Sequence, residues 1–182
     1  MIRTLLYALG GLVLGGVIHL VVILSMPSLA TTAAWDRVAV LGAADGLVIL
    51  PQPAAGEPNP LRLDPELIYA ACQIDLRKGP GTLAGALPQA FWSVAVYGRA
   101  GAVIYSTTNR DAANTRVDLG VFNPAQTRLL AEQQLDIAEG MLIVEASEDD
   151  ILVVVRLAPP YPAMRTRYAE QLSELGCGNI TG

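Results

Sequence analysis

An uninterrupted apolar run at residues 5–24, LLYALGGLVLGGVIHLVVIL, constrains this chain more than any other feature. As an α-helix it would be about 30 Å long, which matches the hydrocarbon thickness of a bilayer. Arg3 precedes the run and the next basic residue is Arg37, so the positive-inside rule predicts a cytoplasmic amino terminus. We therefore predict that residues 5–24 contact the lipid bilayer and that the chain from about residue 30 onward is exported. In a bacterium this would be a single-pass inner-membrane protein with its carboxy-terminal domain in the periplasm.

A cleaved signal peptide is the alternative interpretation of the same run. The apolar region of a signal peptide usually has about 7–15 residues, so the greater length here favours an uncleaved anchor. Ser28-Leu29-Ala30 is nevertheless an acceptable cleavage site, and Pro27 would end the helix just before it. We predict an anchor over residues 1–27, a linker and irregular segment over 28–60, and a β-rich domain over 61–182.

Small residues repeat along one face of the predicted helix. Ala8, Gly11, Gly15 and His19 are spaced three or four residues apart, and such a stripe lets two membrane helices approach closely. It would fit a membrane-protein partner or a second copy of this chain. Glycine is also common in membrane helices, which is the simpler explanation of the stripe.

Charge and composition exclude several classes of function. The chain has 12 basic and 17 acidic residues, so we expect no nucleic-acid partner. His19 is the only histidine, and its place in the apolar run leaves the exported domain without the base of a Ser-His-Asp or Cys-His site. Neither GxxxxGK[ST] nor GxGxxG occurs. We expect no metal and no cofactor, because ligands for a zinc or iron site are too few.

Two cysteines, Cys72 and Cys177, are the whole cysteine content of the chain. An even count in an exported domain predicts a disulfide. Closing so long a loop would be worth about 4–5 kcal/mol in the chain-entropy model, and it would join the carboxy-terminal helix to a core strand. Two buried free thiols are the alternative.

Most of the exported segment has the pattern of short β-strands. The clearest signal is a hairpin, with Phe91–Tyr97 and Ala102–Thr107 joined by the turn 98–101. Further strands are expected at residues 47–50, 67–76, 82–87, 116–122, 141–145 and 151–157. Two late helices follow, one capped by Asn123 with Pro124 and Gln126, and one with Met164, Tyr168, Leu172 and Leu175 on its apolar face. The predicted fold class is mainly β (α+β), an antiparallel β-sandwich-like domain with two late helices after one transmembrane helix.

Three groups of residues are candidates for binding or catalysis. Arg156, late in an apolar strand, and Asn109 with Arg110, after the hairpin, could clamp a carboxylate or phosphate, although a structural ion pair or an exposed strand face is the simpler explanation. Trp92, Tyr97 and Tyr105 could line an aromatic pocket or pack in the core. The acidic residues Glu145, Glu148, Asp149 and Asp150 could bind calcium or form a catalytic carboxylate pair, but they lack the EF-hand spacing and fit a solvated turn.

Three strings of this sequence carry a family resemblance. They are ACQIDL at 71–76, LPQAFWSVAVYGRAGAVIYSTTNR at 87–110 and EASEDDILVVVR at 145–156. With a Gly-Pro turn between the first two, they resemble the family named domain of unknown function 1254, in its short, membrane-anchored alphaproteobacterial form. The resemblance spans residues 67–175 and implies an exported β-rich domain. It supplies no substrate and no catalytic residue, and the larger relatives carry a companion domain, of unknown function 1214, that this chain lacks.

The sequence thus favours a membrane-anchored periplasmic protein that acts as a non-enzymatic module binding a ligand or partner at the envelope. The candidate ligand residues are Trp92, Tyr105, Asn109, Arg110 and Arg156. The alternative is a carboxylate- and Arg-dependent envelope hydrolase, or an accessory subunit of one. A pocket in which Arg110 or Arg156 meets two close carboxylates would favour the hydrolase.

Overall fold

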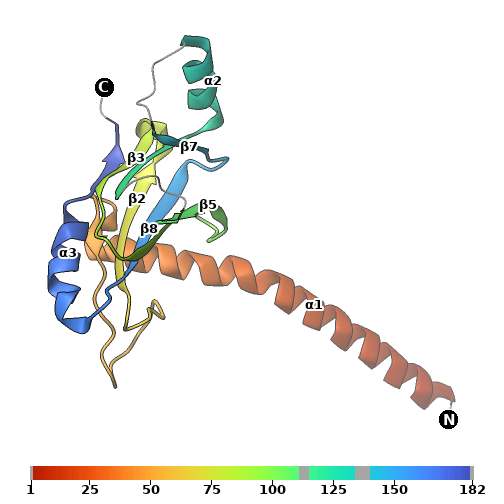
Figure 1. Cartoon of the computed structure of the whole chain (residues 1–182). Coiled ribbons are helices and arrows are strands. Elements are labelled where there is room, and N and C mark those ends of the chain that lie inside the picture. Colours follow the sequence, from red (N-terminus) through yellow and green to blue (C-terminus); the bar gives the residue numbers. More distant parts are fainter. Residues whose placement is uncertain (1, 111–114, 134–139, 181–182) are drawn as a thin grey trace.

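Two β-sheets packed face to face form most of the chain after residue 47, and one long helix extends away from them (Figure 1). The structure is a computed structural model that describes residues 2–110, 115–133 and 140–180, with the backbone alone for residues 27–34 and 133. The predicted β-rich α+β class with an amino-terminal apolar helix is confirmed.

The larger sheet, sheet A, has five strands in the order β1-β2-β8-β4-β5, all antiparallel. Its strands are β1 (Val48–Ile49), β2 (Ile68–Asp75), β8 (Asp150–Ala158), β4 (Phe91–Gly98) and β5 (Val103–Thr108). The predicted hairpin is β4 with β5, and β8 lies at the centre of the sheet between β2 and β4.

The smaller sheet, sheet B, has four strands in the order β7-β6-β3-β9. They are β7 (Leu142–Glu145), β6 (Arg116–Phe122), β3 (Gly81–Ala86) and β9 (Gly176–Asn179). β6 and β7 pair in parallel, so the expected antiparallel arrangement does not extend to this pair. The acidic turn after β7 therefore carries the chain from sheet B to sheet A and does not close a hairpin.

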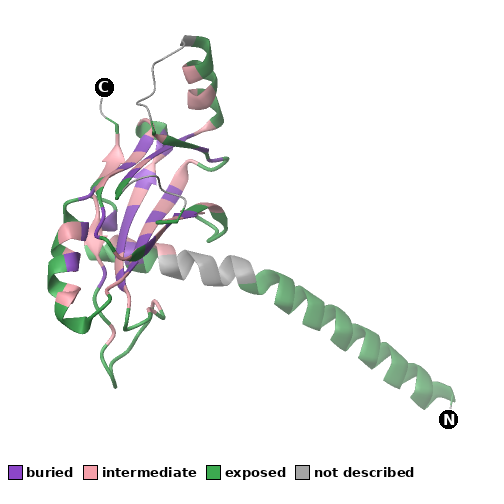
Figure 2. Cartoon of the chain, in the orientation of Figure 1, coloured by how far each residue is buried: buried purple, intermediate pink, exposed green. Residues whose placement is uncertain are grey.

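The main core lies between the inner faces of the sheets. Alternate residues of the central strand β8 point into it, because successive side chains of a strand face opposite sides. The core residues include Val94, Val96, Val153 and Val155 from sheet A and Leu83, Val117, Leu119 and Val121 from sheet B, all buried (Figure 2). Cys72 of β2 and Cys177 of β9 form a disulfide across this core, with 6.5 Å between their Cα atoms. Cys177 lies in a strand that follows the last helix, so the disulfide joins the two sheets and not a helix to a strand.

The two late helices occur where local signals predicted them. α2 (Pro124–Gln133) begins with a reciprocal capping box, in which Gln126 N donates to Asn123 Oδ1 and Asn123 N donates to Gln126 Oε1, each at 2.9 Å. α3 (Arg165–Ser173) buries Tyr168 and Leu172 against the main core. Leu175, just after α3, is buried in the same cluster, so the predicted apolar face is the face that packs.

The amino-terminal helix α1 (Ile2–Val38) continues past Pro27, where we expected it to end. A proline removes one backbone hydrogen bond, and α1 continues in spite of this loss. Residues Ile2–Met26 are long and apolar enough to cross a membrane, and they are exposed (Figure 2). A Cβ atom at Gly11 or Gly15 would meet nothing within 4 Å, so the small-residue face is open and its pairing stays a prediction, as does any role of His19.

The carboxy-terminal end of α1 packs on the outer face of sheet A, the face turned away from sheet B. Val38, Ala43 and Leu50 form a second buried cluster with Ala71 of β2. The Gln73 side chain donates to the Trp35 carbonyl at 2.9 Å and holds the helix end to the strand. The segment 28–60 thus includes β1 and part of a core, and the proposed division at residue 60 stays a prediction.

Candidate functional site

The outer face of β8 carries the one arginine of that strand. Leu152, Val154 and Arg156 alternate with buried core residues and therefore face away from sheet B. Because β8 has a neighbour on each side, Arg156 lies in the middle of sheet A and not at an edge. A charged group at a central strand position costs free energy unless it has a polar partner or a polar occupant nearby.

A shallow trough follows from the strand register. Val154 is paired with Ala71 of β2 and Ala95 of β4, so one row across three strands has short side chains. The flanking rows are taller, since Tyr69 pairs with Arg156 on one side and Leu152 pairs with Tyr97 on the other. Short residues between two tall rows leave space above the sheet.

That space is a cavity of about 310 Å³, which we call the groove. The end of α1 contributes Trp35 and Val38, and the loop before β2 contributes Leu61 and Leu63. The full lining is Trp35, Val38, Leu50, Leu61, Leu63, Tyr69, Ala71, Tyr97, Gly98, Arg99, Gly101, Leu152, Val154 and Arg156. The lining is mostly apolar and has two guanidinium groups and no carboxylate.

Arg156 has a neutral partner in the groove. Its Nη2 donates a hydrogen bond of 2.6 Å to the Tyr97 hydroxyl. On β4, Ala95 lies between Ser93, which is paired with Arg156, and Tyr97. The small methyl group of Ala95 leaves room for the Arg156 side chain to reach the Tyr97 hydroxyl. No carboxylate in the described part of the chain forms an ion pair with Arg156. A guanidinium has five N–H donors, so most of those of Arg156 remain for a ligand.

Arg99, the second guanidinium, is already engaged. Its Nη1 lies 3.2 Å from Asp150 Oδ2, and its Cζ lies 5.4 Å from the ring centroid of Trp35. This cation–π contact links the β4–β5 turn to the end of α1. Arg99 therefore helps to hold the helix over the groove, and Arg156 is the guanidinium that has N–H donors left for a ligand.

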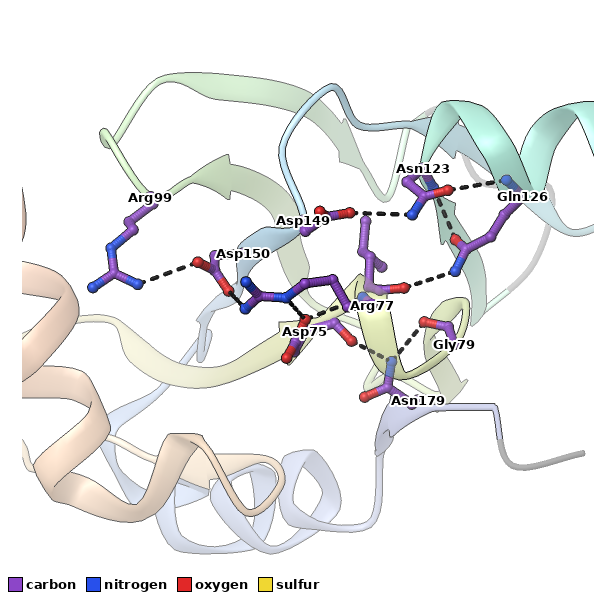
Figure 3. A network of polar contacts seen from close by, with 10 residues as sticks. Asp75, Arg77, Gly79, Arg99, Asn123, Gln126, Asp149, Asp150 and Asn179 are labelled. Atoms are coloured by element: carbon purple, nitrogen blue, oxygen red, sulfur yellow. Dashed lines mark hydrogen bonds and ion pairs between the residues drawn. The ribbon is translucent and has the colours of Figure 1, made fainter.

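The acidic turn is occupied by protein partners (Figure 3). Asp150 accepts from Arg77 at 2.7 Å as well as from Arg99, and Asp149 accepts from the Asn123 amide at 3.1 Å. Glu148 accepts from the Arg99 backbone N–H at 2.9 Å. A Cβ at Gly98 would lie 2.7 Å from Glu148 Oε2, so a larger residue at this position would force the end of the Glu148 side chain to move. Within the described ranges no group of three acidic, histidine or cysteine residues could hold a metal ion.

The same network perturbs two titrating groups. Arg77 Nε lies 2.7 Å from Asp75 Oδ1, and this side-chain hydrogen bond lowers the pKa of Asp75 below its ordinary 3.8. The Asp75 hydrogen bond in turn raises the pKa of Arg77. Both side chains are at the surface, so these pKa shifts arise from a solvated structural network and not from an acid–base site.

The five candidate ligand residues do not come together. Arg156 lies in the groove, whereas Trp92 is buried in the main core on the opposite side of sheet A. Tyr105 packs against that core, and Asn109 and Arg110 are exposed in the turn after β5.

Among the aromatic residues that we considered, Tyr97 lies in the groove. Sequence reasoning missed Tyr69, Trp35, Leu61 and Leu63. The strand pairing across β2, β8 and β4 is what brings Tyr69 next to Arg156.

Comparison with known proteins adds information on the fold alone. No family model and no curated protein sequence matches the chain. The VPA0106 protein of Vibrio parahaemolyticus is similar in structure, with a TM-score of 0.52 at 6% sequence identity, over 65% of this chain and 29% of that one. An uncharacterized protein of Burkholderia cenocepacia gives a TM-score of 0.45 at 12% identity, over 66% of this chain and 33% of that one, which is too low to carry an argument. About two thirds of this chain is thus similar in fold to less than one third of a larger bacterial protein.

Proposed function

We propose that this chain is a membrane-anchored envelope protein whose exported domain binds a small ligand with an apolar body and an anionic group in the groove. One observation carries the proposal. Arg156 faces an apolar cavity, its described partner is a neutral phenol, and none of the lining residues is acidic.

The charge balance of the groove sets the class of ligand. A guanidinium in apolar surroundings binds a carboxylate through two parallel hydrogen bonds, and these are stronger than bonds between neutral groups. The apolar floor and roof would take the body of the ligand, as in most small-molecule sites. A volume of about 310 Å³ is near the lower end for such sites, so the part of the ligand held here is small.

The apolar helix and the disulfide support an envelope location. Ile2–Met26 could be an anchor or a signal sequence, and the disulfide fits an oxidising compartment. The length of the apolar span favours the anchor, and in that case α1 is continuous from the bilayer to Trp35 and Val38 at the groove. We also propose that the membrane is the inner membrane of a bacterium. The chain would then belong to the family named domain of unknown function 1254.

The geometry gives less support to a hydrolase. A carboxylate- and Arg-dependent enzyme needs acidic groups that face the bound substrate. The nearest acidic turn instead directs Glu148 at a backbone N–H and Asp150 at two arginines. A binding module therefore fits the groove better than an enzyme or an enzyme subunit.

Binding of hexanoate to the full-length protein tests the proposal. We expect hexanoate to raise the thermal unfolding temperature in a concentration-dependent way, since a ligand that binds only the folded state stabilises it. Arg156→Gln should weaken binding about tenfold or more, because a hydrogen bond to a charged group contributes roughly 1.5–3 kcal/mol. Arg110→Gln is the matched control, since Arg110 is exposed and outside the groove. Equal effects of the two substitutions, or no stabilisation at any concentration, would contradict the proposal.

A further inference from the structure

A second cavity adjoins the groove. It has a volume of about 450 Å³ and lies between the end of α1 with the turn after it and the proline-rich loop 51–60. Leu61 and Leu63 line both cavities, so these two side chains form the wall between them. Each cavity alone is at the low end for a ligand site, whereas the two together reach the middle of the usual range.

The wall is held by a local turn. The Asn59 side chain brackets Leu63, accepting from its N–H at 2.9 Å and donating to its carbonyl at 2.8 Å. Arg62, between the two leucines, has a φ of 51°, a left-handed conformation that is uncommon for a residue other than glycine. In the described structure, the hydrogen bonds of Arg62 and Leu63 in this turn go to Asn59, and none of them ties Leu61 or Leu63 to a sheet. Small shifts of two aliphatic side chains would therefore connect the cavities.

The second cavity differs from the groove in charge. Its lining is mostly proline and aliphatic, with Val40 and Leu41 on the helical side. Its two charged residues, Arg37 and Glu57, have opposite signs, and Arg37 Nη1 donates to the Pro60 carbonyl at 2.7 Å. The combined space thus has a positively charged part at Arg99 and Arg156 and, beyond Leu61, a mostly apolar part without net charge. This polarity matches a molecule with one anionic head and one long apolar tail.

From these observations, and resting on the function proposed above, we infer that the ligand is a long-chain fatty acid from the bilayer. Its carboxylate would bind Arg156, and its acyl chain would pass Leu61 and Leu63 into the second cavity. The nearness of the membrane supports this source, since Trp35 lies nine residues after Met26, the last residue of the apolar span. That separation is roughly 14 Å along an α-helix.

Photolabelling of the full chain in phospholipid vesicles tests the inference. The first probe is hexadecanoic acid with a diazirine at its methyl end, and the second is hexanoic acid with the same group. Mass spectrometry would map the labelled residues. Labelling of residues 5–24 by the long probe in the bilayer serves as an internal control for its partition.

We expect the long probe to label residues 51–63 and the short probe to label the groove, both at least fivefold less in Arg156→Gln. Leu41→Trp, at a residue that lines the second cavity and not the groove, should reduce labelling of 51–63 by the long probe at least threefold and leave hexanoic acid labelling unchanged. Ala54→Trp, also in the lining of the second cavity alone, is a second variant with the same expectation. Leu129→Trp is the matched control, because Leu129 is exposed on α2.

The outcomes separate the two proposals. If the short probe labels the groove through Arg156 but the long probe does not label 51–63, the fatty-acid inference is overturned and the proposed function stands. If long-probe labelling of 51–63 is the same in Arg156→Gln, its label comes from nonspecific contact and the inference is also overturned. If neither probe labels the groove, both proposals fail.

Discussion

Arg156 Nη2 and the Tyr97 hydroxyl lie 2.6 Å apart on the outer face of sheet A, joined by a hydrogen bond across the position of Ala95. This contact satisfies one guanidinium donor without neutralising the charge. An ion pair with a carboxylate would have made Arg156 a structural residue, whereas a phenol orients it and leaves its charge for a ligand.

Removal of the Tyr97 hydroxyl should therefore affect ligand binding more than folding. In Tyr97→Phe we expect hexanoate affinity to fall three- to tenfold, because Arg156 loses the group that orients it. The free energy of unfolding should fall by about 1 kcal/mol, the usual net value of one hydrogen bond. Urea unfolding and a hexanoate titration measure the two effects.

Tyr161→Phe is the control for this substitution, since Tyr161 is 68% exposed and outside the groove. Hexanoate affinity that is the same in both variants would mean that Tyr97 does not position Arg156.

The disulfide should make a large contribution to the stability of the two-sheet fold. Cys72 and Cys177 are 105 residues apart and join the two sheets, so the bond restricts the unfolded chain strongly. We expect Cys72→Ala with Cys177→Ala to lower the free energy of unfolding by about 2–5 kcal/mol, measured by guanidinium denaturation. Reduced wild-type protein should unfold close to the same midpoint as this double variant. A reduced wild-type protein as stable as the oxidised one would contradict the expectation.

Asp75 should make the domain sensitive to acid. Its pKa is lower in the folded state than its ordinary 3.8, because Arg77 donates to its carboxylate. The stabilisation is thus fully present above pH 3.8 and is lost as the pH falls through the lowered value. Asp75→Asn should show a shallower loss of thermal stability than wild type as the pH falls below 3.8, and added salt should reduce the difference because Arg77 is exposed and Asp75 is partly exposed.

Glu132→Gln, exposed on α2, is the control for this pH dependence. A profile for Asp75→Asn that is parallel to that of wild type would show that the pair with Arg77 contributes nothing to stability.

The amino terminus of the mature protein should show whether α1 remains. We expect the apolar segment to be retained, because its span of Ile2–Met26 is longer than the apolar region of a signal peptide. Amino-terminal sequencing of protein from membranes measures this. A mature chain that begins at Thr31 would exclude the anchor and would leave Trp35 and Val38 in place at the groove.

If the anchor is retained, crosslinking in membranes with and without Gly15→Leu tests the small-residue face of α1. An unchanged crosslinking pattern would exclude pairing through Gly11 and Gly15.

Local signals in the sequence predicted the elements that form by local rules. The β4–β5 hairpin has β-branched and aromatic strands on both sides of a glycine turn, and α2 has its reciprocal cap at Asn123 and Gln126. β9 was missed, since its sequence GCGN has little strand propensity. That strand is held by pairing with β3 and by the disulfide at Cys177, which are both long-range contacts.

The candidate site was harder to predict because it, too, depends on long-range contacts. Arg156 stood out because a charge in an apolar strand is unusual, whereas Trp92 looked equally promising and lies in the core. The groove takes residues from the end of α1, the loop before β2, and strands β2, β4 and β8, which meet through non-consecutive strand pairing. A single sequence does not specify that pairing, so the juxtaposition of Trp35, Leu61 and Arg156 followed from the structure alone.

A fluorescence titration with a charge-reversed pair of ligands tests the central claim most directly. Trp35 lines the groove and Trp92 is buried in the core, so a ligand in the groove should change the emission of Trp35, and Trp35→Phe should abolish the change. We predict saturable binding of hexanoate to the wild-type protein, at least tenfold tighter than binding of hexylammonium, which has the same tail and the opposite charge. In Arg156→Gln this preference should disappear. Equal affinity of the wild-type protein for the two ligands, or an unchanged preference in Arg156→Gln, would contradict the account of the groove as an anion site.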